Sequence, residues 1–202
     1  MSELWTIEKE LFEKGIALVC GCDEAGAGPL AGPVCAGAVI LRPFEEIEGL
    51  NDSKKLTEKK RDALYDVITA RAVAWSAAMV DEKTIDEINI LNARMLAMER
   101  AINGLRVRPD FALIDGNRNK GITCPNQMVV KGDSRSASIA AASIIAKVTR
   151  DRYMLEMAEK YPQYAFEKHK GYGTKLHYER IIAHGPSPIH RLTFLKNLEE
   201  HR

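Results

Sequence analysis

Residues 16–41 of this chain read IALVCGCDEAGAGPLAGPVCAGAVIL, and this stretch decides the fold. Its first part, residues 16–23, is apolar and contains Val and Cys, which predicts a strand that ends before Gly26 and Gly28. Residues 34–41 are again apolar and predict a second strand. The Gly- and Pro-containing turn between them is too short to hold a crossover helix, so we expect the two strands to pair antiparallel.

Outside this stretch, apolar periodicity, capping residues and breakers predict further helices and strands. We expect strands over residues 73–80, 111–115 and 128–131, helices over residues 3–14, 57–70, 84–104 and 136–160, and shorter helical stretches around 174–184 and 191–199. Thr57, Thr84 and Ser134 are the expected N-caps of the three longer helices that follow residue 50. The many small residues of 139–147 indicate close backbone packing. The order predicts an α/β sheet protein with a helical C-terminal region.

The composition is that of a globular protein. The chain has 202 residues, of which 46% are hydrophobic and 28% charged, and this excludes a disordered chain and a disulfide-dense miniprotein. A membrane helix needs about 20 consecutive apolar residues, and we expect none because no such run is present. The four cysteines form no CxxC pair and suit buried thiols in a reducing compartment, so we expect a cytoplasmic protein.

The net charge of +1 does not by itself indicate a polyanionic partner. The distribution of charge is uneven, because residues 160–202 hold eight Lys and Arg against four Glu, and a second basic cluster lies at residues 54–61. Two interpretations stay open, a nucleic-acid-binding surface and solvated helix faces. All five histidines also lie in residues 160–202, with no pair at metal-binding helical spacing, and we expect most of them at the surface.

Four carboxylates lie at the expected strand ends. Asp23 and Glu24 end the first strand, Asp115 ends the fourth and Asp133 follows the fifth. Ligands of open α/β sheets bind beyond the strand ends, and carboxylates that meet there repel one another unless hard divalent cations such as Mg²⁺ or Mn²⁺ bind between them. Two such ions about 3.5–4 Å apart form the clamp for in-line phosphodiester hydrolysis. The alternative, in which a carboxylate merely caps a turn, stays open for any single one.

Residues 26–31, GAGPLA, also match the dinucleotide fingerprint G-x-G-x-x-A. A dinucleotide site needs a helix that begins at this point, with its N-terminus facing the pyrophosphate. Here Pro29 and Pro33 intervene, a strand is expected next, and the carboxylates of Asp23 and Glu24 would repel the phosphates. We therefore favour glycines that let backbone N–H groups approach a ligand closely.

Five segments together resemble a known family. They are CDEAGAGPLAGPVCAGAVIL from residue 22, LNDSKKLTEKKR from residue 50, ALIDGN from residue 112, VVKGDSRSASIAAASIIAKVTRDRYM from residue 129 and HKGYGT from residue 169. In this order and spacing they resemble bacterial ribonuclease HII, the type 2 ribonuclease H. The resemblance implies a ribonuclease H-like catalytic domain over residues 1–160, with a mixed five-stranded sheet whose first three strands are antiparallel, flanked by helices. It also implies a helical extension over residues 161–202 that completes the substrate groove.

The activity that the resemblance implies is metal-dependent endonucleolytic hydrolysis of RNA in RNA–DNA hybrids. It also implies incision 5′ of ribonucleotides embedded in duplex DNA, leaving 5′-phosphate and 3′-hydroxyl ends. The family's catalytic and metal-binding carboxylates fall on Asp23, Glu24, Asp115 and Asp133, which implies a two-ion site for Mn²⁺ or Mg²⁺.

Further substrate contacts follow from the same resemblance. The family's Gly-Arg-Gly motif, whose backbone reads the 2′-hydroxyl, falls on Gly26, Ala27 and Gly28, so its arginine is absent here. The family's tyrosine that packs on the deoxyribose 3′ of the ribonucleotide falls on Tyr172.

The basic residues Lys54, Lys55 and Lys170 are the expected phosphate contacts. The expected partners are RNA–DNA hybrids and DNA duplexes that contain ribonucleotides, with no membrane, and we expect a monomer. Because Ala27 replaces the arginine, a protein that binds hybrids without cleaving them stays open as an alternative.

Overall fold

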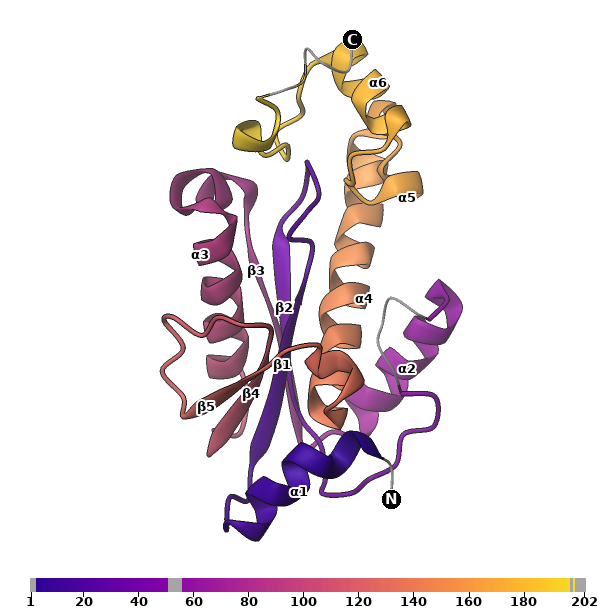
Figure 1. Cartoon of the computed structure of the whole chain (residues 1–202). Helices are drawn as coiled ribbons and strands as arrows, with labels where there is room; N and C mark the ends of the chain where they lie inside the picture. Colours follow the sequence, from indigo (N-terminus) through magenta and orange to yellow (C-terminus); the bar gives the residue numbers. More distant parts are fainter. Residues whose placement is uncertain (1–2, 51–55, 197, 199–202) are drawn as a thin grey trace.

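The computed structural model describes residues 3–50, 56–196 and 198. Its centre is a five-stranded sheet in the order β3-β2-β1-β4-β5 (Figure 1). The strands are β1 (Val19–Ala25), β2 (Val34–Ile40), β3 (Ala74–Val80), β4 (Phe111–Asp115) and β5 (Asn126–Val129). β2 pairs antiparallel with both β1 and β3, whereas β4 runs parallel to both β1 and β5. The predicted α/β class and the mixed sheet with its antiparallel first three strands are therefore confirmed.

Helices cover both faces of this sheet. The described residues form α1 (Thr6–Glu13), α2 (Glu58–Arg71), α3 (Glu82–Asn103), α4 (Ala137–Lys160), α5 (Phe166–His169) and α6 (Lys175–His184). α3 packs on one face, α4 packs on the other, and α2 lies outside α4 (Figure 1). Buried apolar side chains fill both interfaces, with Met98 on the α3 side and Ile145 on the α4 side. In the described parts of the chain, no helix combines the length and apolarity needed to cross a bilayer.

Helix α4 approaches the sheet closely because small residues meet at the contact. A Cβ atom added at Gly21 of β1 would overlap the backbone of Ser138 and Ile139. A Cβ atom added at Gly37 of β2 would overlap the carbonyl of Ala142. The first half of α4 therefore lies directly against the backbone of the two central strands, as its small residues predicted.

The helix N-termini confirm one of the three predicted caps. The Thr57 hydroxyl accepts a hydrogen bond of 3.3 Å from the backbone N–H three residues on, and α2 begins there. Helix α3 begins two residues before Thr84, because the Asp81 carboxylate accepts the Thr84 N–H at 2.8 Å. Ser136 caps α4 in place of Ser134, which lies in a short 3₁₀ helix, Gly132–Ser134. At both wrong positions, a second side chain with equal capping chemistry lay two or three residues away.

The C-terminal segments pack on the end of α4 and on the loop between β1 and β2 (Figure 1). Buried Tyr164 and Phe166 stack there with ring centroids 5.4 Å apart, against Met154 of α4. The helix expected over residues 191–199 is reduced, among the described residues, to a short 3₁₀ helix, Leu192–Phe194. The cause is Asp86 of α3, whose carboxylate accepts the backbone N–H groups of residues 192 and 193 and holds them on α3.

Three histidines of this region are buried, so the expectation that most histidines lie at the surface is wrong. His169, His177 and His190 are 7%, 0% and 3% exposed. The rings of His169 and His177 stack with centroids 4.2 Å apart, and Nε2 of His177 lies 3.0 Å from Nε2 of His190. Burial lowers the pKa of His177 to about 3 and that of His190 to about 4, so both rings are neutral core residues at pH 7.

Candidate active site

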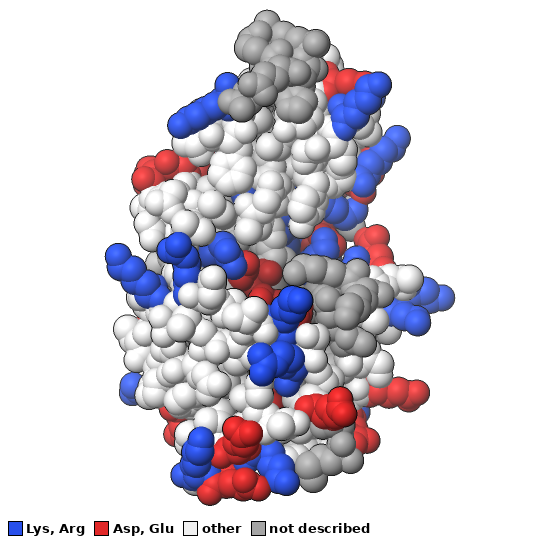
Figure 2. Space-filling model, viewed as in Figure 1, with Lys and Arg blue, Asp and Glu red and all other residues white. Residues whose placement is uncertain are grey.

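The carboxyl ends of three neighbouring strands bring acidic residues to one edge of the sheet. Cys22 of β1 is in register with Ile114 of the parallel strand β4, so the next residues, Asp23 and Asp115, lie side by side. Asp115 is the last residue of β4, whereas β1 continues for two residues beyond Asp23 instead of ending at Asp23 and Glu24 as expected. Asp133 follows β5 in the short 3₁₀ helix before α4 and is 8% exposed. Figure 2 shows acidic side chains recessed between Lys and Arg side chains at mid-height of one face.

Strand alternation places Asp23 and Glu24 on opposite faces of the sheet. The Cys22 thiol points to the carbonyl of Met98 in α3, so Asp23 faces α4 and Glu24 faces α3. The Asp23 carboxylate accepts the backbone N–H of Glu24 at 2.7 Å. On the other face, Oε1 of Glu24 lies 2.5 Å from Nη2 of Arg94 in α3. Sequence reasoning found no cation beside these carboxylates and missed Arg94, because it comes from another element 70 residues on.

Asp115 fixes the segment that carries Asp133. Its Oδ1 accepts the backbone N–H of Gly132 at 2.6 Å, which ties the end of β4 to the start of the 3₁₀ helix. A Cβ atom at Gly132 would lie 3.2 Å from that same oxygen and closer still to the Ile139 side chain. Only glycine fits here without a shift, so the contact with Asp115 fixes the backbone next to Asp133 at the end of β4.

Glu8 of α1 contacts the start of α4, directly after the segment that carries Asp133, and sequence reasoning missed this contact. Its fully buried carboxylate accepts the Ser136 hydroxyl at 2.6 Å and the Ser138 backbone N–H at 3.0 Å through Oε1. Negative charge at the first turn of a helix is stabilising, and here it fixes the start of α4. The contact spans 128 residues, and a glutamate in an amphipathic N-terminal helix gives no sequence signal of it.

The donor set fits a hard divalent cation. Asp23, Asp115 and Asp133 supply carboxylate oxygens from one edge of the sheet, and Glu24 follows Asp23 directly. Oxygen ligands of this kind suit Mg²⁺ or Mn²⁺ rather than a thiolate-seeking metal. Within the described residues, no three carboxylate, imidazole or thiol groups are gathered around one point.

The loop between β1 and β2, residues 26–33, is called the glycine loop and lies just beyond Asp23 and Glu24. Two buried arginines hold its backbone carbonyls. Arg191 donates to the carbonyls of Gly26, Ala27 and Gly32 at 2.6, 2.9 and 2.9 Å. Arg150 donates in the same way to the carbonyls of residues 31, 33 and 170. Burial lowers the pKa of Arg191 to about 9, so the guanidinium keeps its charge at pH 7. Sequence reasoning identified the loop and missed both arginines.

Tyr172 and Lys170 lie on the neighbouring turn. The carbonyl of Lys170 is one of the acceptors of Arg150, and the Gly171 carbonyl accepts the Leu30 N–H at 2.8 Å, so this turn is fixed to the glycine loop. Tyr172 is 42% exposed, and the Lys147 ammonium lies 5.9 Å from its ring centroid. The Lys170 ammonium donates to the Glu167 carbonyl at 2.7 Å. The other two predicted lysines, Lys54 and Lys55, lie outside the described residues.

The comparisons with known proteins agree with this geometry. The model of the Ribonuclease HII family matches residues 20–197. The chain belongs to the ribonuclease HII family. Ribonuclease HII of Caldicellulosiruptor bescii is 54% identical over 192 residues, covering 95% of this chain and 93% of that protein. Ribonuclease HII of Dechloromonas aromatica is 56% identical over 179 residues, covering 89% and 91%. The crystal structure of ribonuclease H2 from Pyrococcus horikoshii OT3 matches with a TM-score of 0.73 at 29% identity, covering 91% and 97%.

As a member of the ribonuclease HII family, the chain is a metal-dependent endoribonuclease that cleaves RNA in RNA–DNA hybrids. The family match includes all four carboxylates, the glycine loop and Tyr172. The dinucleotide alternative fails on the structure, because the loop after Gly28 leads directly into β2 and no helix begins between residues 28 and 34, all of which the structure describes.

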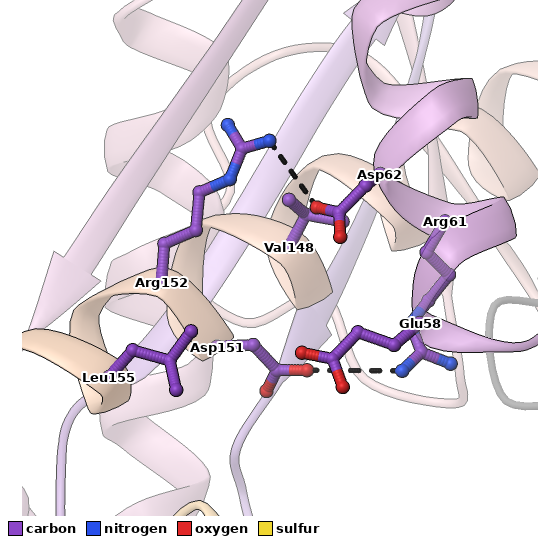
Figure 3. Close-up of a pocket in the computed structure, with 7 residues that line it drawn as sticks. All are labelled: Glu58, Arg61, Asp62, Val148, Asp151, Arg152 and Leu155. Carbon is purple, nitrogen blue, oxygen red and sulfur yellow. Dashed lines mark hydrogen bonds and ion pairs between the residues drawn. The ribbon is translucent and has the colours of Figure 1, made fainter. Parts of the chain in front are cut away.

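A charged pocket of about 280 Å³ lies between α2 and α4 of this ribonuclease HII family member (Figure 3). Across it, Arg61 and Arg152 form ion pairs of 4.0 and 3.3 Å with Asp151 and Asp62. The buried Asp151 also accepts the Lys147 ammonium at 2.6 Å, which connects the pocket wall to the lysine above Tyr172. No sequence pattern indicated this network, because its members come from two helices far apart in the chain.

Proposed function

We propose that this chain incises duplex DNA on the 5′ side of single embedded ribonucleotides, in addition to cleaving RNA in hybrids. The products carry 5′-phosphate and 3′-hydroxyl ends. The observation that carries the proposal is the placement of Asp23, Asp115 and Asp133 at one edge of the sheet, beside a fixed glycine loop and an exposed tyrosine.

The four carboxylates are the proposed ligands of two Mg²⁺ or Mn²⁺ ions. When bound, the ions supply activation of the attacking water and neutralisation of the leaving oxygen. The chain's own part is to hold its carboxylates in place: Gly132 orients Asp115, the Glu24 N–H orients Asp23, and Arg94 holds Glu24 until a cation competes for it.

The substrate contacts follow from the loop and the turn that the buried arginines hold together. The backbone of Gly26, Ala27 and Gly28 is the proposed reader of the 2′-hydroxyl. The Tyr172 ring is the proposed support for the next sugar, which lacks that hydroxyl. Together they would define a junction from RNA to DNA.

Lys54, Lys55 and Lys170 are the proposed phosphate contacts. A phosphate at Lys170 would compete with the Glu167 carbonyl for the ammonium. These contacts position a duplex without reading its sequence, and their strength falls with salt.

We further propose that residues 161–202 form the helical extension that completes the substrate groove beside the catalytic domain of residues 1–160. In support, one buried cluster joins Tyr164 and Phe166 of the extension to Met154 of α4 and Ala31 of the glycine loop. We propose that the protein acts as a monomer in the reducing cytoplasm, where its four free cysteines stay reduced.

The test is cleavage of a DNA duplex that contains one ribonucleotide, with a titration of Mg²⁺ and of Mn²⁺ and with EDTA as the blank. We expect metal-dependent cutting at one position, 5′ of the ribonucleotide. Asp23→Asn and Asp133→Asn should each lower the rate on the order of 10³-fold, since each removes several kcal/mol of stabilisation of the reacting charges. Asp66→Asn on the exposed side of α2 is the matched control and should keep full activity.

Three results would contradict the proposal. Cutting in EDTA would exclude the metal mechanism, and full activity of both Asn variants would exclude the assigned ligands. Binding of the duplex without any cleavage in either metal would favour the alternative of a protein that binds hybrids without turnover.

A further inference from the structure

The side chain of Arg191 is fully buried, and among the described residues its hydrogen bonds all go to backbone carbonyls. Its Nη2 and Nη1 atoms donate to the carbonyls of Gly26 and Ala27 at 2.6 and 2.9 Å, and Nε donates to the carbonyl of Gly32 at 2.9 Å. In the part of the chain that the structure describes, Arg191 forms no ion pair with a carboxylate. The guanidinium therefore holds three carbonyls of the glycine loop through charge-assisted hydrogen bonds.

The direction of these carbonyls fixes the direction of the amides that follow them. A trans peptide is planar, with its C=O and N–H on opposite sides. Because the carbonyls of Gly26 and Ala27 point inward to Arg191, the N–H groups of Ala27 and Gly28 point away from it. Neither N–H donates a hydrogen bond to any described residue.

The space in front of these amides is open. Gly28 is exposed, and a Cβ atom added to it would meet no atom within 4 Å. At Gly26, by contrast, φ is +88° and an added Cβ atom would overlap the Arg150 side chain. Packing inside the protein therefore explains the glycine at position 26 and leaves the one at position 28 unexplained, as expected if a ligand approaches there.

Two further contacts prevent the loop from turning its amides inward. Arg150 holds the second half of the loop through the carbonyls of Ala31 and Pro33, at 3.0 and 2.9 Å. Asp86 of α3 accepts the backbone N–H groups of Leu192 and Thr193 at 2.8 and 3.0 Å, directly after Arg191. The arginine is thus anchored on α3 through its own backbone while its side chain holds the loop.

We propose that Arg191 is a positioning residue for substrate recognition, and that it presents the N–H groups of Ala27 and Gly28 as a fixed donor pair for the ribonucleotide 2′-hydroxyl. The inference rests on the proposed junction recognition and adds the residue that orients the backbone donors for it. A cation bound to the two carbonyls also polarises the peptides and strengthens their N–H groups as donors. A deoxyribose lacks the 2′-hydroxyl that would accept from this pair, so Arg191 contributes to discrimination between RNA and DNA without touching either.

The variant test compares Arg191→Lys with the wild type on the duplex with one ribonucleotide, using the all-DNA duplex of the same sequence as a competitive inhibitor. A lysine keeps the charge and cannot serve three separated carbonyls. We expect KM for the ribonucleotide duplex to rise about tenfold, the value for losing one or two ordinary hydrogen bonds, with the inhibition constant of the all-DNA duplex unchanged. Arg180→Lys on the exposed side of α6 is the matched control and should change neither constant.

Two measurements keep the inference testable if Arg191→Lys fails to fold. Asp86→Asn, at a half-buried site, should raise KM about threefold with the same selectivity, since it loosens the anchor of Arg191 by a fraction of one hydrogen bond. In the wild type, the Ala27 and Gly28 amides should exchange with solvent rapidly by NMR, because they have no internal acceptor.

The possible failures are distinguishable. A wild type that binds the two duplexes equally well overturns the proposed function. A wild type that discriminates, together with folded variants whose KM and inhibition constant rise in parallel or do not move, overturns the role of Arg191 alone. Slow exchange of the two amides in the free protein overturns the donor pair.

Discussion

The carboxylate of Glu24 lies 2.5 Å from the guanidinium of Arg94, on the opposite face of the sheet from its neighbour Asp23. This ion pair is largely buried, with the Glu24 side chain 10% exposed and the Arg94 side chain 27% exposed. A divalent cation that uses all four carboxylates has to compete with Arg94 for Glu24. The ion pair therefore sets part of the free-energy cost of filling the proposed metal site.

Arg94→Gln should lower the Mg²⁺ concentration that gives half-maximal activity about fivefold. The reason is that the change removes about 1 kcal/mol of competition and a positive charge close to the bound cation. The measurement is a Mg²⁺ titration of cleavage at saturating substrate. Arg100→Gln, an exposed arginine on the same helix, is the control and should not shift the titration. A half-saturating concentration that rises in Arg94→Gln would show that the arginine orients Glu24 for the ion instead of competing with it.

Ala27→Arg should tighten binding of the ribonucleotide duplex a few-fold at low salt. The backbone carbonyl of Ala27 is already held by Arg191, so the new side chain can reach a phosphate without disturbing the loop. One added phosphate contact also steepens the dependence of binding on salt. The measurement is KM at two salt concentrations, with the uncharged Ala27→Met as the control for size. An Ala27→Arg variant that is less active than the wild type would mean that the site is adapted to alanine.

Glu8→Ala should lower the free energy of unfolding by about 2–4 kcal/mol. It leaves a buried hydroxyl and a buried N–H at the start of α4 without their acceptor. Glu8→Gln keeps one acceptor oxygen and should lose less, about 1 kcal/mol. Urea unfolding measures both changes, with exposed Glu10→Gln on the same helix as the control. Equal stability of Glu8→Ala and the wild type would show that α1 does not support the segment that carries Asp133.

The buried histidines should make the protein less stable in acid. The pKa of His177 is lowered to about 3 and that of His190 to about 4, mainly by burial, whereas an unfolded histidine titrates near pH 6.5. As the pH falls below about 6.5, the unfolded chain takes up protons that the folded chain does not, and the free energy of unfolding falls with it. By pH 5 this amounts to about 2 kcal/mol for each ring.

The measurement is urea unfolding of the wild type and of His177→Gln at pH 7 and pH 5. The wild type should lose its advantage over the variant by about 2 kcal/mol between the two pH values. Exposed His184→Gln is the control and should follow the wild type at both. A gap between wild type and His177→Gln that stays constant would mean that His177 titrates alike in the folded and unfolded chains.

Most of the sheet could be predicted from the sequence, because the signals that define it are local. An apolar run, a Gly/Pro turn too short for a helix and a second apolar run leave few pairings other than the observed hairpin of β1 and β2. The expected strand over residues 128–131 runs two residues later than β5, since Val130 is apolar and yet 58% exposed beyond the last pair of the ladder. The placement of Asp23, Asp115 and Asp133 at one edge follows from the strand order in the same way.

The partners of these residues could not be predicted, because each comes from a distant part of the chain. Arg94 reaches Glu24, Glu8 reaches Ser136, and Arg191 reaches the glycine loop only after the layers have packed. For the basic residues after position 160, the sequence left open a nucleic-acid-binding surface and solvated helix faces, but Arg191 is used inside the protein. The buried histidines were missed for the same reason, since their spacing follows the packing of turns and not a helix period.

Gly21 and Gly37, in the two central strands, set the width of the proposed catalytic centre. Asp23 and Asp115 are carried by the strands, whereas Asp133 lies just before the start of α4, so the gap between helix and sheet also separates the proposed ligands. Gly21 and Gly37 keep that gap at its minimum, because any side chain there would act as a spacer. A methyl group added at Gly21 or Gly37 would push α4 away from the sheet and so change the distance between the carboxylates. A substitution in the core could thus abolish nuclease activity with every carboxylate unchanged.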